Sequence, residues 1–149
     1  MLIGHTFLIE RICKAFNKEN GAKLKKIFVD YDLIEIEKMN LSKEDINLAN
    51  KIQNLRGEPN YVLNEFCSLF GNNEITETIK RLFSVISPIA NKYGINLQLD
   101  PSFQPHFNLY NGIVFQLVCS TDTAPLVIAR GGRYDSIVKH FSNDKTSSS

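Results

Sequence analysis

Residues 113–129 have the sequence Ile-Val-Phe-Gln-Leu-Val-Cys-Ser-Thr-Asp-Thr-Ala-Pro-Leu-Val-Ile-Ala, and this stretch decides the fold that we expect. Its two ends, 113–118 and 126–129, are short apolar runs rich in β-branched residues, which favours strands. The connection between them, 120–125, is rich in turn-forming residues. The stretch therefore predicts two neighbouring antiparallel strands.

The period of the apolar residues differs on the two sides of residue 94. Residues 95–99 alternate apolar and polar side chains and predict a half-buried strand, and the apolar residues 1–3 predict another. Residues from about 5 to 93 have apolar side chains at helical spacing. The sequence therefore predicts an α+β fold, with helices on a mainly antiparallel sheet.

Capping residues and glycines predict where the helices begin and end. The expected helices run from Thr6 as N-cap to Asn20-Gly21, around Leu24 to Phe28, from Ser42 to Gly57, from Pro59 to Gly71, from Asn72 or Asn73 through Pro88 to Gly94, and from Tyr134 to Phe141. We expect Gly131-Gly132 to break the last strand. The expected domain covers 1–141, with a helical segment at about 5–93, a sheet segment at about 95–141, and a polar tail at 142–149.

Composition excludes several classes of protein. The 149 residues include 17 Lys and Arg against 16 Asp and Glu, a formal net charge of +1, which argues against a nucleic-acid binder that works by bulk charge. The three cysteines form no C-x-x-C pair, which favours a reducing compartment, and hence the cytoplasm. No apolar run approaches the roughly 20 residues of a membrane span.

Generic catalytic motifs are missing, so we expect no catalytic residue, no metal and no cofactor. His5, His106 and His140 lack the spacing of metal ligands. A basic cluster, which consists of Lys23, Lys25 and Lys26, is interpreted as a solvated helix face, with a patch for an acidic ligand as the alternative.

Two short segments stand out as a candidate binding site. One has Tyr110 and a glycine just before the strand at 113–118, and the other is Gly131-Gly132-Arg133-Tyr134-Asp135. The hairpin would bring Tyr110 and Tyr134 to one end of the sheet, where two phenols above the glycines could hold a small, flat, polar molecule. In the alternative interpretation, the glycines merely end a strand and both tyrosines are core.

The segment from Asp100 to Phe115 resembles the motif D-L-S-L-V-R-G-L-D-Y-Y-T-G-x-V-F of the class II histidyl-tRNA synthetase family, and aligns with it without a gap. Gly131 to Asp135 is similar to the second histidine-pocket motif of that family, G-G-R-Y-D. The resemblance extends from about Ile3 to Phe141. It implies a central fragment of a class II synthetase-like catalytic core with a helical insertion, and a remnant histidine pocket formed by Tyr110, Gly131, Gly132, Arg133 and Tyr134.

Departures from this motif indicate which branch of the family fits. Pro105 occupies the position of the arginine that assists amino-acid activation, Asn108 that of an aspartate, and Leu109 that of the first tyrosine. Proline cannot stabilise the charge that develops during adenylation, and the sequence does not place Arg130 or Arg133 there.

The resemblance therefore implies the non-catalytic branch, the regulatory subunits of ATP phosphoribosyltransferase in histidine biosynthesis. Its implied partners are the catalytic subunit and histidine as an effector. A histidine–tRNA ligase and a synthetase-like binding module are the alternatives.

Overall fold

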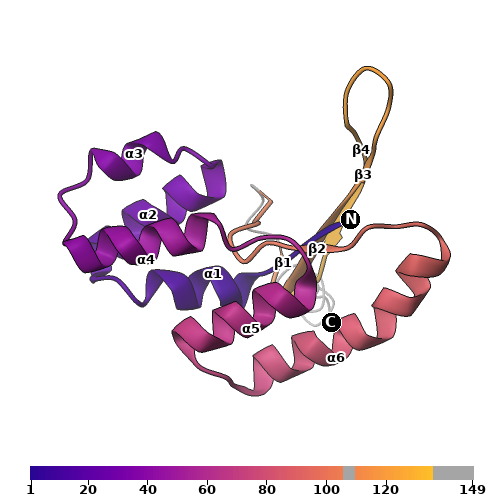
Figure 1. The fold of residues 1–149 in the computed structure, drawn as a ribbon, viewed down its shortest axis with the longest axis horizontal. Helices are drawn as coiled ribbons and strands as arrows, with labels where there is room; N and C mark the ends of the chain where they lie inside the picture. Colours follow the sequence, from indigo (N-terminus) through magenta and orange to yellow (C-terminus); the bar gives the residue numbers. More distant parts are fainter. Residues whose placement is uncertain (106–109, 136–149) are drawn as a thin grey trace, which may run out of the picture.

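The computed structural model describes residues 1–105 and 110–135. The elements follow the order β1 (Leu2–His5), α1 (Thr6–Cys13), α2 (Lys18–Asp30), α3 (Ile34–Glu37), α4 (Lys43–Gln53), α5 (Pro59–Phe70), α6 (Glu74–Lys92), β2 (Gln98–Leu99), β3 (Ile113–Cys119) and β4 (Leu126–Gly132). No helix in these two ranges is both long and apolar enough to cross a membrane. The helices lie beside one end of a sheet, from which the β3–β4 hairpin projects (Figure 1).

The sheet has four strands in the order β2-β1-β3-β4. Strand β3 is antiparallel to both β1 and β4, as we expect, but β1 and β2 are parallel, so the sheet is mixed. Parallel neighbours need a long crossover connection that brings the chain back to the end where the first strand began. The six helices between β1 and β2 form this connection. The predicted α+β class with a mainly antiparallel sheet is confirmed, and the structure adds one parallel pair at the edge.

Capping side chains fix most of the helix starts. Ser42 accepts a hydrogen bond from the backbone N–H of Asp45 at the start of α4, and Asn73 and Thr76 form a capping box at the start of α6. Helix α5 begins at Pro59, and α6 continues through Pro88. These features agree with the sequence prediction.

Three predicted boundaries are wrong. The N-cap of α1 is His5, whose Nδ1 accepts from the N–H of Phe7, and Thr6 is already helical. Gly21 lies inside α2 and does not end a helix. Glycine is needed there because a Cβ would come within 2.4 Å of the carbonyl oxygen of Cys13. Helix α4 ends at Gln53, and the backbone of Gly57 pairs with Leu99 of β2.

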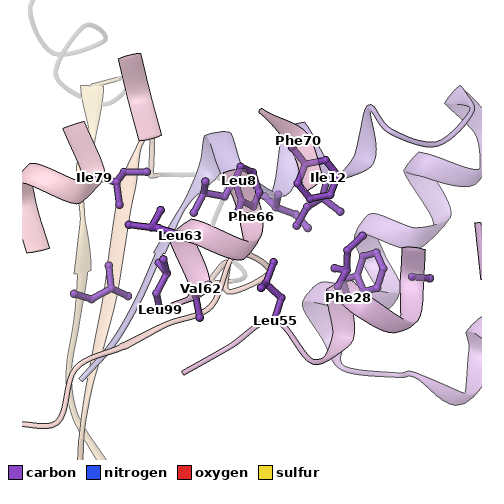
Figure 2. Close-up of a cluster of buried hydrophobic side chains, with 14 of the residues drawn as sticks. Leu8, Ile12, Phe28, Leu55, Val62, Leu63, Phe66, Phe70, Ile79 and Leu99 are labelled. Atoms are coloured by element: carbon purple, nitrogen blue, oxygen red, sulfur yellow. The ribbon is translucent and has the colours of Figure 1, made fainter. Parts of the chain in front are cut away.

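The core lies between the helices and one face of the sheet (Figure 2). Its largest fully buried side chains come from four of the six helices and from β2: Phe28, Phe66, Phe83, Leu8, Ile9, Ile12, Leu24, Leu63, Leu99 and Val62. Ile3 of β1 and its cross-strand partner Phe115 of β3 belong to this core face. Because strand side chains alternate, the residues next to them point to the opposite face, which carries the candidate site.

Candidate functional site

Tyr110 and Tyr134 lie together at one end of the sheet, as the hairpin prediction requires. Tyr110 precedes β3 and Tyr134 follows β4, and antiparallel pairing places these two ends side by side. The ring centroids are 5.1 Å apart and the planes meet at 43°, a tilted aromatic pair. Tyr134 is 47% exposed, so it is not a core residue.

Gly131 and Gly132 do not break β4 but pair with Phe115 and Val114 of β3. A Cβ on Gly132 would lie 2.6 Å from the Tyr110 ring and 2.9 Å from a backbone oxygen. A Cβ on Gly131 would lie 2.7 Å from the Phe115 ring. The Tyr110 ring thus covers β4 on one face and the Phe115 ring covers it on the other. Side chains at positions 131 and 132 would prevent these rings from lying so close to the backbone.

Arg133 and Asp135 hold the segment after β4. The Arg133 Nε donates to Asp135 Oδ1 at 2.8 Å, and this hydrogen bond is the main cause that raises the pKa of the Arg133 side chain. The backbone of Arg133 also pairs with Asn111 and Ile113, at 2.7 and 3.2 Å. Arg133 thus lies beside the tyrosine pair on a fixed backbone.

Gly112 joins this end of the sheet to α1. Its N–H donates to Thr6 Oγ1 at 2.8 Å, its carbonyl oxygen accepts from the Thr6 N–H at 2.9 Å, and its φ of 93° favours glycine. His5 lies next to it, and burial lowers the pKa of the imidazole. Since Nδ1 of the neutral ring caps α1, the role of His5 in the structure is a helix cap.

Asp100 is a buried carboxylate, 3% exposed, that links three segments of the chain. It accepts from the N–H of Ser102 at 2.8 Å and from the Tyr31 hydroxyl, and it pairs with Arg56 Nη2 at 3.3 Å. The Arg56 guanidinium also lies 4.4 Å from the centroid of the Tyr31 ring. Asp100 and Ser102 lie in the segment that resembles the family motif, whereas no local motif in the sequence points to Tyr31 and Arg56.

A cavity of about 360 Å³ lies on the sheet face opposite the core. Its lining comes from β1, β3 and β4, from the end of α2 and from the segment after β2: Leu2, Val29, Asp30, Tyr31, Phe103, Gln104, Pro105, Gln116 and Arg130. Pro105 and Arg130 are thus brought to one cavity, which the sequence did not reveal.

Several expected features lie outside the described residues: Asn108, Leu109, His106, His140, the helix after residue 135, and the tail at 142–149. Within 1–105 and 110–135, no group of three or more His, Cys, Asp or Glu side chains is placed to hold a metal ion.

Comparison with known proteins gives one family and one group of relatives. The family model described as histidyl-tRNA synthetase matches residues 1–148. A protein of Prochlorococcus marinus strain MIT 9211 is 49% identical over 97% of this chain and 37% of its own length, and a Synechococcus protein is 40% identical over 93% and 36%. Both are named ATP phosphoribosyltransferase regulatory subunit. The chain therefore spans little more than a third of these curated relatives.

A solved structure from Bacillus halodurans, titled as an ATP phosphoribosyltransferase regulatory subunit/histidyl-tRNA synthetase, has the same fold. The TM-score is 0.74 at 19% identity, over 95% of this chain and 38% of that one. This similarity confirms the class II synthetase-like fold. Because the family model matches nearly every residue, the chain belongs to the histidyl-tRNA synthetase family.

Proposed function

We propose that this chain is part of a regulatory subunit of ATP phosphoribosyltransferase and that it has no catalytic residues of its own. The observation that carries the proposal is the 49% identity, over 97% of the chain, to a relative with that name. Residues 1–141 would form the central part of its synthetase-like domain. Its three cysteines are free thiols, which supports a reducing compartment and hence a cytoplasmic location.

The reaction would take place on a separate catalytic subunit, which joins ATP and phosphoribosyl pyrophosphate and releases pyrophosphate. This chain would help to hold that subunit in its active assembly. Pro105 supports the division of roles, because this motif position offers no positive charge to a developing adenylate, and the guanidinium in the same cavity wall, Arg130, comes from β4.

Histidine would be the effector, bound near the tyrosine pair. The proposed pocket consists of Tyr110, Gly131, Gly132, Arg133 and Tyr134. Tyr134 is exposed on one side and packs on Tyr110 on the other, so a flat imidazole could extend the aromatic pair. Feedback then requires histidine to prefer one assembly state, a coupling of typically about 1–3 kcal/mol.

The test measures phosphoribosyltransferase activity of the catalytic subunit with and without this protein, across a histidine titration. We expect activation by the protein and inhibition by histidine. Replacing Tyr134 by Ala should raise the histidine concentration needed for inhibition and leave the activation intact. Tyr61→Ala is the matched control, since Tyr61 is 58% exposed on α5. If the rate with the protein equals the rate without it at every histidine concentration tested, the proposal is refuted.

A histidine–tRNA ligase is the second candidate, because the matching family model carries that description. It predicts histidine-dependent exchange between pyrophosphate and ATP, which the regulatory subunit should not catalyse. A binding module for another protein, the third possibility, would show neither activity. Co-purification of the catalytic subunit distinguishes this module from our proposal.

A further inference from the structure

A hollow of about 400 Å³ lies where α1 and α2 meet, and none of its lining residues belongs to the sheet. The two helices cross closely here, because a Cβ on Gly21 of α2 would lie 2.4 Å from the carbonyl oxygen of Cys13 at the end of α1. Gly21 and Ala22 both line the hollow and carry no long side chain to fill it. This α1–α2 hollow is separate from the tyrosine pair and from the cavity on the sheet.

Three lysines surround the α1–α2 hollow. Lys14 directly follows α1, whereas Lys18 and Lys25 belong to α2. Lys18 and Lys25 are seven residues apart, which is two helical turns or about 10.5 Å along one face of the helix. Gly21 and Ala22 lie between them in the sequence. The positive charges therefore come from both helices, on either side of a space that small residues leave open.

These three charges have no anionic partner in the structure. Within residues 1–105 and 110–135, none of the three ammonium groups forms an ion pair. Glu10 is the one acid among the described residues that line the hollow. Burial raises the pKa of the Cys13 thiol, and the positive charge of Lys25 opposes this rise, so the Lys25 charge acts on the wall of the hollow. An anion placed between the lysines would relieve the repulsion among them.

The structure divides the basic cluster that the sequence shows on α2. Lys23 Nζ forms an ion pair with Glu19 at 2.7 Å, so its charge already has a partner. Lys26 is not part of the lining of the α1–α2 hollow, whereas Lys25 is. Lys25 therefore acts together with the other two lysines of the hollow, and Lys26 provides an equal charge one residue away for comparison.

We propose that the α1–α2 hollow binds a diphosphate group, either free or as part of a small phosphorylated molecule. A diphosphate carries several negative charges on a compact group, so it can contact ammonium groups from both helices at once. The aromatic residue in the lining, Phe16, is only 7% exposed and offers little ring surface for a base to stack on. We therefore expect the diphosphate itself to be recognised. This binding does not depend on the proposed regulatory role.

The experiment is calorimetric titration of the protein with inorganic pyrophosphate, in a buffer that contains no other phosphate. We expect one saturable site, and ADP should bind about as tightly as pyrophosphate because both present a diphosphate. Lys18→Gln and Lys25→Gln should each weaken the binding of pyrophosphate about five- to tenfold. Lys26→Gln is the matched control, since it removes the same charge from the same helix, and it should change the affinity less than about twofold.

Two further variants keep all the lysines. Ala22→Leu places a larger side chain between Lys18 and Lys25, and should weaken the binding of pyrophosphate about tenfold without changing the net charge. Glu10→Gln removes the acid from the lining and should strengthen binding about two- to threefold. Glu19→Gln is the control for Glu10→Gln, because Glu19 is on α2 but outside the lining. Circular dichroism of each variant checks that it is folded.

Three results would overturn the inference. The first is the lack of saturable pyrophosphate binding by the unsubstituted protein, which would show that the lysines form only a solvated helix face. The second is an equal effect of Lys25→Gln and Lys26→Gln together with no effect of Ala22→Leu, which would indicate general attraction to a positive surface. The third is binding of ADP without binding of pyrophosphate, which would show that the nucleoside is recognised and not the diphosphate.

Discussion

The Tyr31 hydroxyl should contribute to stability through its hydrogen bond to the buried Asp100. Replacing Tyr31 by Phe removes this hydroxyl and keeps the ring, so the contact with the Arg56 guanidinium is retained. The variant therefore isolates one bond between the residue after α2 and the residue after β2.

The size of the effect follows from the surroundings of the two groups. A hydrogen bond to a charged group typically contributes about 1.5–3 kcal/mol. Tyr31 is 41% exposed, so water can take over part of the hydrogen bonding of its hydroxyl. Asp100 is only 3% exposed, so water cannot fully solvate its carboxylate. We expect Tyr31→Phe to lower the free energy of unfolding by about 1–2 kcal/mol at neutral pH. For a chain of this length each kcal/mol lowers Tm by about 2–4 °C.

Urea unfolding followed by circular dichroism measures the difference. Tyr61→Phe is the control, because Tyr61 is 58% exposed and its hydroxyl has no hydrogen-bond partner among the described residues. This control should change the free energy of unfolding by less than about 0.5 kcal/mol. An equal effect of the two substitutions would contradict the assigned role of the Tyr31 hydroxyl.

A comparison of the unsubstituted protein with Tyr31→Phe at different pH values gives a second test. Burial, followed by the nearby Asp100 charge, raises the pKa of the Tyr31 hydroxyl above its ordinary value of about 10. Above that pH the unfolded chain loses the tyrosine proton while the folded chain keeps it, so stability falls as pH rises. The difference in free energy of unfolding between the unsubstituted protein and Tyr31→Phe should have its full size below about pH 10 and should shrink between pH 10 and 11.5. An advantage that stays constant to pH 11.5 refutes this reasoning.

Three further predictions concern the glycines, a helix cap and the cysteines. Gly132→Ala should lower the free energy of unfolding by about 1–3 kcal/mol and change the near-ultraviolet dichroism of Tyr110, because the new methyl would overlap the ring; unchanged spectrum and stability would count against the packing. Asn73→Ala should cost about 1 kcal/mol in a thermal melt, since it removes the side-chain half of the α6 capping box, and a variant as stable as the parent would show that this cap is dispensable. At pH 8 the Cys13 thiol, whose pKa burial raises to about 11, should react with a disulfide reagent much more slowly than the exposed Cys119, and equal rates would contradict the burial of Cys13.

Local patterns in the sequence predicted the parts of the fold that depend on local physics. Ser42, Pro59 and Asn73 start their helices as expected, because capping and the missing N–H of proline act within one turn. The β3–β4 hairpin was also predicted, since its turn and both of its strands are contiguous in the chain.

Interactions between distant segments were not predictable in the same way. Gly21 has the pattern of a helix stop, but it is a crossing point of α1 and α2, which no single-segment pattern reveals. The bond from Tyr31 to Asp100 joins residues 69 positions apart. The meeting of Tyr110 with Tyr134 was predicted because it follows from the hairpin, whereas the shared cavity of Pro105 and Arg130 depends on the whole fold.

The parallel pairing of β1 with β2 has a consequence for synthesis of the protein. Leu2 and Ile3 emerge from the ribosome well before their neighbours Gln98 and Leu99, and before the β3 residues on their other side. At about 5–20 residues per second, this part of the sheet waits several seconds for its partners. During that delay the helices can assemble first, and the backbone N–H and C=O groups of the strand Leu2–His5 have no strand partner. Such an unpaired strand can bind another chain, so we expect a chaperone that binds nascent chains to reduce aggregation at this stage.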